Sequence, residues 1–212
     1  MALLEVKNLD VGFDTPEGKV HAVNRPSFSI DAGETMALVG ESGSGKTQTV
    51  MAILGLLAEN GQASGQALLN GKDLLQMSTP ELNQHRGSEI AMIFQDPMSS
   101  LNPTMKIGKQ IAETVKVHQH ASDNEAMQKA IALLEKTKIP EAAKRAQQYP
   151  FEFSGGMLQR AIIAMSMACD PTLLVADEPT TALDVTIQSQ TLEIMHALQQ
   201  NMGMSIILIT HD

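Results

Sequence analysis

The sequence predicts an α/β fold in which a parallel sheet is joined to antiparallel β structure and to a helical lobe. In the last third, a strand at 172–176, a helix at 185–200 and a strand at 205–209 alternate, an order typical of a parallel sheet. The first half instead contains short strands separated by turn residues, which favours antiparallel pairing. With 212 residues, 43% of them hydrophobic, the chain is long enough for one sizeable domain with a core.

The first half is predicted to hold strands at 3–11, 27–30 and 35–39. The turn 31–34 separates the last two, and Asn-Gly within 68–72 is a strong signal for a hairpin. We therefore expect antiparallel strands around one buried strand, 35–39, which leads into a glycine-rich loop and a helix at 47–56.

The middle of the chain is predicted to be helical, at 106–119 and again at 124–136. Apolar residues recur there at helical spacing, for example Ile107, Ile111 and Val115. This segment is the expected helical lobe.

Composition excludes several classes of protein. A net charge of −9 and a pI of about 5.1 argue against a broad nucleic-acid-binding face. The single cysteine, Cys169, cannot form an intrachain disulfide and is interpreted as a core residue. No apolar run reaches the ~18–20 residues that a membrane-spanning helix needs, so we expect a protein that is soluble by itself. The chain stops at Asp212, directly after a predicted strand, which suggests a C-terminal truncation.

The segment GESGSGKT matches the phosphate-binding pattern G-x-x-x-x-G-K-[ST] and lies, as that pattern requires, between a predicted strand and a predicted helix. Its residues are Gly40, Glu41, Ser42, Gly43, Ser44, Gly45, Lys46 and Thr47. Small residues let successive backbone N–H groups surround phosphate oxygens, and the N-terminus of the helix adds positive charge. Lys46 would reach the β- and γ-phosphates, and the Thr47 hydroxyl would ligate Mg²⁺.

A second candidate group is the carboxylate pair Asp177-Glu178 at the end of the strand 172–176. Because side chains alternate along a strand, the two carboxylates should point in different directions. One can then hold Mg²⁺ while the other addresses the attacking water. An isolated Asp-Glu pair would be read as an ordinary acidic turn, but the phosphate loop in the same chain favours the catalytic interpretation.

A second Ser-Gly-Gly turn, at Ser154 to Gly156, opens another predicted helix. It is one of six motifs that occur in a fixed order: the phosphate loop, FQDP at 94–97, FSGGM at 153–157, LLVADEP at 173–179, TALD at 181–184 and THD at 210–212. Together they resemble the nucleotide-binding subunit of an ABC transporter over essentially the whole chain. The sequence in and around these motifs is most similar to that of the ATPases of bacterial oligopeptide, dipeptide and nickel importers.

The resemblance implies an α/β P-loop NTPase (RecA-like) core with an antiparallel β subdomain and a helical subdomain that bears the signature motif. One ABC-type ATP-binding domain would span 1–212, with the core and β subdomain at about 1–94 and 166–212 and the helical subdomain at about 97–165.

The resemblance also implies roles for single residues. Gln95 matches the glutamine that senses the γ-phosphate and Mg²⁺, Glu178 the catalytic carboxylate, and His211 the histidine that contacts the γ-phosphate. Asp177 would help to hold Mg²⁺. Phe13 matches the aromatic residue that stacks on adenine, usually a tyrosine, and its π face suits this role; a plain position in the strand core is the alternative.

Ser154, Gly155 and Gly156 match the signature segment, which in such dimers caps the ATP held by the phosphate loop of the other subunit. Ser154 is expected to cap its helix, and the glycines to let backbone N–H groups approach the γ-phosphate. Asp184 would cross the same interface. The fifth signature position is Met157, where glutamine is more common, and we read it as a marker of the importer subgroup.

The implied function is an ATP-hydrolysing motor subunit of an importer for peptides or nickel, with ATP and Mg²⁺ as cofactors. Its implied partners are a second ABC ATPase subunit (a heterodimer in the full transporter, or a homodimer), integral membrane permease subunits and, indirectly, a solute-binding protein, with no nucleic acid. The implied location is the cytoplasmic face of the inner membrane, peripheral through the permease. A soluble ABC ATPase acting on ribosomes or DNA is the alternative, and a small-molecule kinase would not explain FSGGM, Gln95 or His211.

Overall fold

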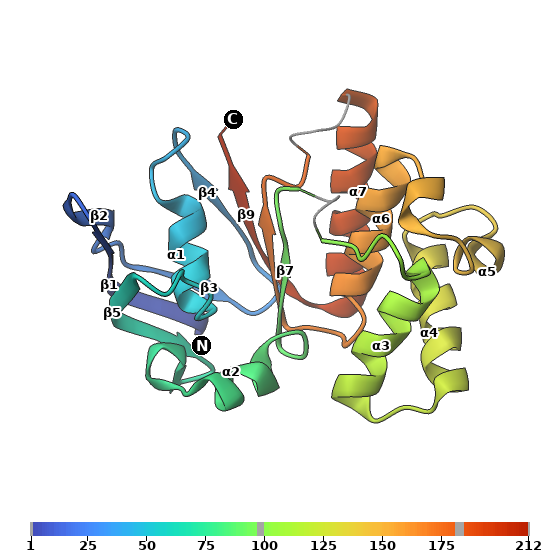
Figure 1. Cartoon of the computed structure of the whole chain (residues 1–212), viewed down its shortest axis with the longest axis horizontal. Helices are drawn as coiled ribbons and strands as arrows, with labels where there is room; N and C mark the ends of the chain where they lie inside the picture. The colour runs from blue at the N-terminus through green and yellow to red at the C-terminus, as the bar shows by residue number, and fades with distance from the viewer. Residues whose placement is uncertain (1, 97–99, 181–184, 212) are drawn as a thin grey trace. The chain divides into compact units, whose positions relative to one another are not determined.

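The computed structural model describes residues 2–96, 100–180 and 185–211, with no description of the side chains of 185 and 186. The chain divides into two compact units, Met1–Arg86 with Ser205–Asp212, and Gly87–Met204. Each unit is described by itself, and Figure 1 shows the elements of both. The predicted subdomain bounds stay a prediction.

An antiparallel sheet forms most of the first unit. Its strands are β1 (Ala2–Thr15), β2 (Gly18–Asn24), β3 (Phe28–Asp31), β5 (Gly61–Leu69) and β6 (Lys72–Asp73). The long strand β1 pairs with β2, β3 and β5, and β5 pairs with β6, all antiparallel. Asn70 and Gly71 have φ of 48° and 81° and join β5 to β6, the left-handed conformation of a two-residue hairpin turn. The predicted hairpin is confirmed.

Strand β1 buries its apolar side chains on one face along most of its length, because a bulge shifts the in–out alternation of its side chains by one residue. Leu4 and Val6 are buried before the bulge, and Leu9 and Val11 after it. At the bulge itself Asn8 has a positive φ, and the pairing register with β5 shifts between Lys7 and Asp10. Without this inserted residue, the second half of β1 would turn its apolar side chains to the opposite face.

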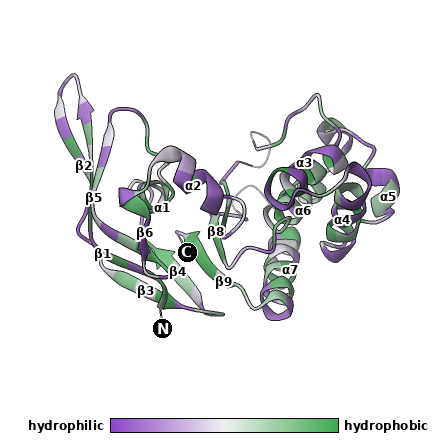
Figure 2. Cartoon of the chain, turned by 90° about the horizontal axis from the view of Figure 1, so that it is seen from below, coloured by the Kyte–Doolittle hydropathy of each residue, from purple (hydrophilic) through white to green (hydrophobic). Residues whose placement is uncertain are grey.

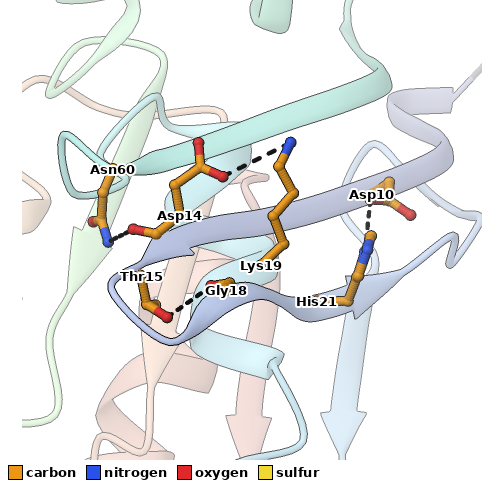
Figure 3. Close-up of polar contacts among 7 residues, drawn as sticks. All are labelled: Asp10, Asp14, Thr15, Gly18, Lys19, His21 and Asn60. Atoms are coloured by element: carbon orange, nitrogen blue, oxygen red, sulfur yellow. Dashed lines mark hydrogen bonds and ion pairs between the residues drawn. The ribbon is translucent and has the colours of Figure 1, made fainter.

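The opposite face of this sheet is polar (Figure 3). His21 Nδ1 lies 3.5 Å from Asp10 Oδ1, and Lys19 Nζ lies 3.7 Å from Asp14 Oδ1. Both pairs join β1 to β2. Exposed pairs of this kind contribute little energy, so the apolar face accounts for most of the stability of the sheet.

A parallel strand pair completes the first unit. Strand β4 (Thr35–Val39) pairs with β9 (Ser205–Thr210) in parallel register, from Thr35 opposite Ile206 to Val39 opposite Thr210. Figure 2 shows β9 hydrophobic along most of its length. The prediction that 35–39 is a buried strand is wrong: Ala37 is exposed and Val39 is 64% exposed. The apolar composition of β4 suits burial, but the described residues cover these two side chains only in part.

Three helical segments belong to the first unit. They are α1 (Lys46–Ile53), the 3-10 turn η1 (Leu74–Gln76) and α2 (Thr79–His85). Helix α1, predicted at 47–56, contacts β1, β2 and η1. Ser78 and Glu81 form a capping box at the start of α2, in which each side chain bonds the backbone of the other. The sequence analysis did not predict β2 or α2.

The second unit combines a parallel strand pair with helices. Strands β7 (Ile90–Ile93) and β8 (Leu173–Asp177) pair in parallel, and every residue of β8 is buried. The helices are α3 (Ile107–Gln119), α4 (Asp123–Lys136), α5 (Ala142–Arg145), the 3-10 turn η2 (Pro150–Glu152), α6 (Gly155–Ser166) and α7 (Val185–Met202). Helices α3 and α4 pack on each other and on α6, and α6 packs on α7. The predicted helices and strands in this part are confirmed within one or two residues, whereas β7, α5 and η2 were not predicted.

Within the described residues, no helix has both the length and the apolar character that crossing a bilayer requires.

Candidate functional site

The phosphate loop joins β4 to α1 and depends on glycine at two positions. Gly43 and Gly45 have φ of 79° and 89°, in the left-handed region that favours glycine. Gly45 is also the N-cap of α1, and a Cβ placed there would lie 2.2 Å from the Ala22 carbonyl oxygen of β2. No other residue type fits at position 45, so β2 fixes where α1 begins.

Lys46 folds back over this loop. Its Nζ donates hydrogen bonds to the Gly40 carbonyl at 2.6 Å and to the Glu41 carbonyl at 2.9 Å. The side chains or backbone of Ser42, Gly43, Ser44 and Thr47 are exposed. An ammonium group and a helix N-terminus therefore lie at the same open loop, an arrangement that suits an anionic phosphate.

The parallel pair β4–β9 brings His211 to the same end of the sheet as the phosphate loop. Val39, the last residue of β4, is opposite Thr210, the last residue of β9. Gly40 and His211 follow these residues directly in the chain. Carboxyl ends of parallel strands are the usual place of ligand sites in such sheets.

Phe13 occupies an intermediate environment in β1. Its ring lies against Gly61 of β5, where an added Cβ would come within 2.7 Å of Phe13 Cε1. The backbone beside it is fixed by Asn60, whose Nδ2 donates to the Asp14 carbonyl at 2.9 Å (Figure 3), while the Asp14 N–H donates to the Asn60 carbonyl, also at 2.9 Å. The ring is only partly buried, so it is accessible for stacking while held from one side. Its role stays a prediction.

In the second unit, the strand pair β7–β8 brings Gln95 to Glu178. Ile93 is opposite Ala176, and each candidate residue lies two positions further along the chain, just past the end of its strand. Gln95 Nε2 donates a hydrogen bond to Glu178 Oε2 at 3.0 Å. Glu178 has a φ of 45°, so the chain turns directly after the strand. Asp177 is 3% exposed whereas Glu178 is partly exposed, so the two carboxylates differ in environment.

The Ser-Gly-Gly turn opens α6, as predicted. The Ser154 Oγ accepts a hydrogen bond from the Met157 N–H at 3.4 Å and caps the helix. A Cβ on Gly156 would lie 3.0 Å from Ile187 Cγ2 of α7, whereas among the described residues nothing outside its own stretch of chain lies within 4 Å of a Cβ on Gly155. Gly156 thus serves close packing of two helices, and Gly155 has no such described neighbour.

The predicted residues thus fall into two groups, one in each unit. Phe13, the phosphate loop and His211 belong to the first unit, and Gln95, Asp177, Glu178 and the Ser154–Gly156 turn to the second. Asp184 lies outside the described residues. The sequence analysis missed Ala22, whose carbonyl closes on Gly45, because no local pattern marks a contact made by a different strand.

A family model described as "ABC transporter" matches residues 23–181, which include the phosphate loop, Gln95, both carboxylates and the Ser-Gly-Gly turn. The chain belongs to the ABC transporter family.

Its curated relatives include transport ATP-binding proteins for peptides. The chain is 53% identical over 211 residues to the oligopeptide transport ATP-binding protein of Escherichia coli strain K12, covering 100% of this chain and 63% of the relative. It is 54% identical to the protein of the same name from Bacillus subtilis strain 168, with 99% and 59% covered. It is 50% identical to the dipeptide transport ATP-binding protein of Escherichia coli, with 100% and 65% covered. The chain therefore spans about three fifths of the length of these relatives.

Solved structures show the same fold. A dimeric ATP-binding cassette in a post-hydrolysis state with ADP and Pi superposes with a TM-score of 0.87 at 24% identity, covering 99% of this chain and 88% of that one. A component of an ABC transporter complex from Clostridium perfringens gives a TM-score of 0.81 at 25% identity, with 100% and 79% covered. The predicted fold class is confirmed: an α/β P-loop NTPase core with an antiparallel β subdomain and a helical subdomain.

The phosphate loop yields a stability test that needs no nucleotide. Gly45→Ala should lower the free energy of unfolding more than Gly43→Ala, measured by urea denaturation. Both variants force a left-handed φ on alanine, which costs about 1–2 kcal/mol. Only Gly45→Ala also meets a backbone carbonyl, whereas position 43 is open. Equal losses for the two variants would contradict the close contact with Ala22.

Proposed function

We propose that this chain is the ATP-binding and ATP-hydrolysing part of an importer for small peptides. The observation that carries the proposal is the open phosphate loop with Lys46 over it, in a chain whose family is that of ABC transporters. Peptides are the favoured cargo because the relatives are named for oligopeptide and dipeptide transport; nickel is the second candidate.

ATP binding is assigned to the first unit. The N–H groups of Ser42 to Gly45 and the N-terminus of α1 would receive the phosphates. Lys46 would exchange its bonds to the Gly40 and Glu41 carbonyls for bonds to phosphate oxygens, and Phe13 would stack on the adenine.

Magnesium is proposed to be held by the Thr47 hydroxyl, the Gln95 side chain and Asp177, together with the phosphates of the nucleotide. Hydroxyl, amide and carboxylate oxygens are the ligands that Mg²⁺ prefers. When bound, the ion would neutralise charge on the transferred phosphoryl group.

Hydrolysis is assigned to Glu178 as the general base that aligns the attacking water. Gln95 would position this carboxylate, since its amide already donates to Glu178. His211 would contact the γ-phosphate from the end of β9.

The pocket is proposed to be completed by a second ATPase subunit packed head to tail. Its Ser154, Gly155 and Gly156 would approach the γ-phosphate held by the phosphate loop of this chain, and Asp184 would cross the same interface. Gly155 suits this role because no described side chain outside its own stretch of chain lies near its Cβ position. The partner subunit is either a sister ATPase or a second copy of this chain.

Coupling to transport requires integral membrane permease subunits, and a solute-binding protein would deliver the cargo to them. The chain would then work at the cytoplasmic face of the inner membrane, attached through the permease. An ABC ATPase that acts without a permease is the less favoured alternative, because the curated relatives are named as transport proteins.

Glu178→Gln should lower the ATPase rate by about 10²–10⁴-fold, the usual effect of losing a positioned general base. ATP binding should persist, because the phosphate loop is untouched. Steady-state phosphate release and nucleotide binding are the two measurements, with Glu135→Gln, an exposed glutamate on α4, as the matched control. A Glu178→Gln protein that hydrolyses ATP at the normal rate would remove Glu178 from this role.

Gly155→Ala should abolish most ATPase activity without loss of stability. In the described part of the structure, nothing outside the adjoining stretch of chain lies within 4 Å of the added methyl group. The melting temperature should therefore not fall, whereas the approach of a phosphate on the facing subunit would be obstructed. Binding of ADP by the chain itself should be unchanged. Full ATPase activity in this variant would argue against a signature that works across the interface.

A further inference from the structure

The C-terminus of α1 ends in a compact turn that leaves two carbonyl groups available. Leu54 is the C-cap, and Gly55 follows with a φ of 63°. The Gly55 N–H donates to the Ala52 carbonyl at 3.0 Å, and the Leu56 N–H donates to the Met51 carbonyl at 2.8 Å. This pair of bonds defines a Schellman motif.

The side chain of Arg86 donates hydrogen bonds to the two carbonyls that this motif leaves without a partner. Its Nε donates to the Leu54 carbonyl at 2.7 Å and its Nη2 to the Gly55 carbonyl at 2.6 Å. Its Nη1 donates to Asn83 Oδ1 at 2.9 Å, which orients the guanidinium group. Bonds from a charged donor are about twice as strong as neutral ones, and a cation at a helix C-terminus also interacts favourably with the helix dipole.

Close packing fixes this contact in place. Arg86 is the C-cap of α2, and its N–H donates to the Leu82 carbonyl. A Cβ on Gly55 would lie 2.6 Å from Leu82 Cδ1 and 2.9 Å from Arg86 Nη2. The end of α1 and the end of α2 therefore touch with no room for another atom between them.

Helix α1 packs on β1, β2 and η1, but its capping groups do little to hold its direction. It has 8 residues, no side-chain hydrogen bond at its N-cap and no acidic residue in its first turn. Such a helix is about 12 Å long, so a tilt of roughly 5° at one end moves the other end by about 1 Å. Misplacement of this size is enough to weaken a binding geometry substantially.

We propose that Arg86 is a positioning residue for the phosphate loop: by holding the C-terminus of α1, it aims the N–H groups at the opposite end of the helix toward the phosphates. The inference rests on the proposed function of this loop. It adds a residue that touches no nucleotide and belongs to none of the motifs found in the sequence.

The test is titration calorimetry of the protein with ADP and Mg²⁺. Arg86→Met should raise the Kd by about 5–20-fold, because the C-terminus of α1 loses its charge-assisted hydrogen bonds and the N–H groups at the other end lose their aim. The number of binding sites per chain should stay unchanged. Arg86→Lys should fall between, because a single ammonium group lacks the planar fork that serves both carbonyls. Lys72→Met, which removes an exposed cation of the same unit, should bind as the wild type does.

Two results would overturn the proposal. One is a Kd for Arg86→Met within twofold of the wild type. The other is a reduced number of binding sites at an unchanged Kd, which is the signature of partial unfolding alone. If Arg86→Met does not fold, the Kd of Arg86→Lys decides the question by the same criteria. A wild-type protein that binds no ADP, or Lys46→Ala that binds it normally, would instead refute the proposed function and with it this inference.

Discussion

The register of two parallel strand pairs is the constraint on which the candidate site depends. Val39 opposite Thr210 sets the start of the phosphate loop beside His211, and Ile93 opposite Ala176 sets Gln95 beside Glu178. Because side chains alternate along a strand, a slip of one residue would turn these groups to the other face. Backbone pairing inside each unit thus brings together residues that lie far apart in the sequence.

Helix α1 links the structure of the first unit to its proposed chemistry. At its N-terminus, Gly45 is held against the Ala22 carbonyl, and the N–H groups there are available to an anion. At its C-terminus, Arg86 bonds the last carbonyls. The Arg86 guanidinium complements the helix dipole at this end, and an anion bound at the N-terminus would complement it at the other.

Local signals allowed most of the fold to be predicted. Asn70-Gly71 identified a hairpin turn, and apolar spacing identified α3 and α4, because each depends on neighbours in the sequence. Strand β7 was missed since its four apolar residues show no alternation. The exposure of Val39 was missed because apolar character does not say what covers a strand. Single residues show the same limit: the phosphate loop is recognisable by itself, Gln95 only by resemblance, and Ala22 and Arg86 only once the chain is folded.

The central claim is that a complete catalytic pocket draws on two subunits. Its most direct test is the ATPase activity of an equimolar mixture of Lys46→Ala and Gly155→Ala chains, each of which is inactive alone on this account. Mixed dimers would contain one intact pocket, formed by the phosphate loop of one chain and the Ser-Gly-Gly turn of the other. The mixture should recover roughly a quarter of the wild-type activity, since half of the dimers are mixed and each has one of two pockets. A mixture no more active than either variant, while the wild type is active at the same concentration, would contradict the account.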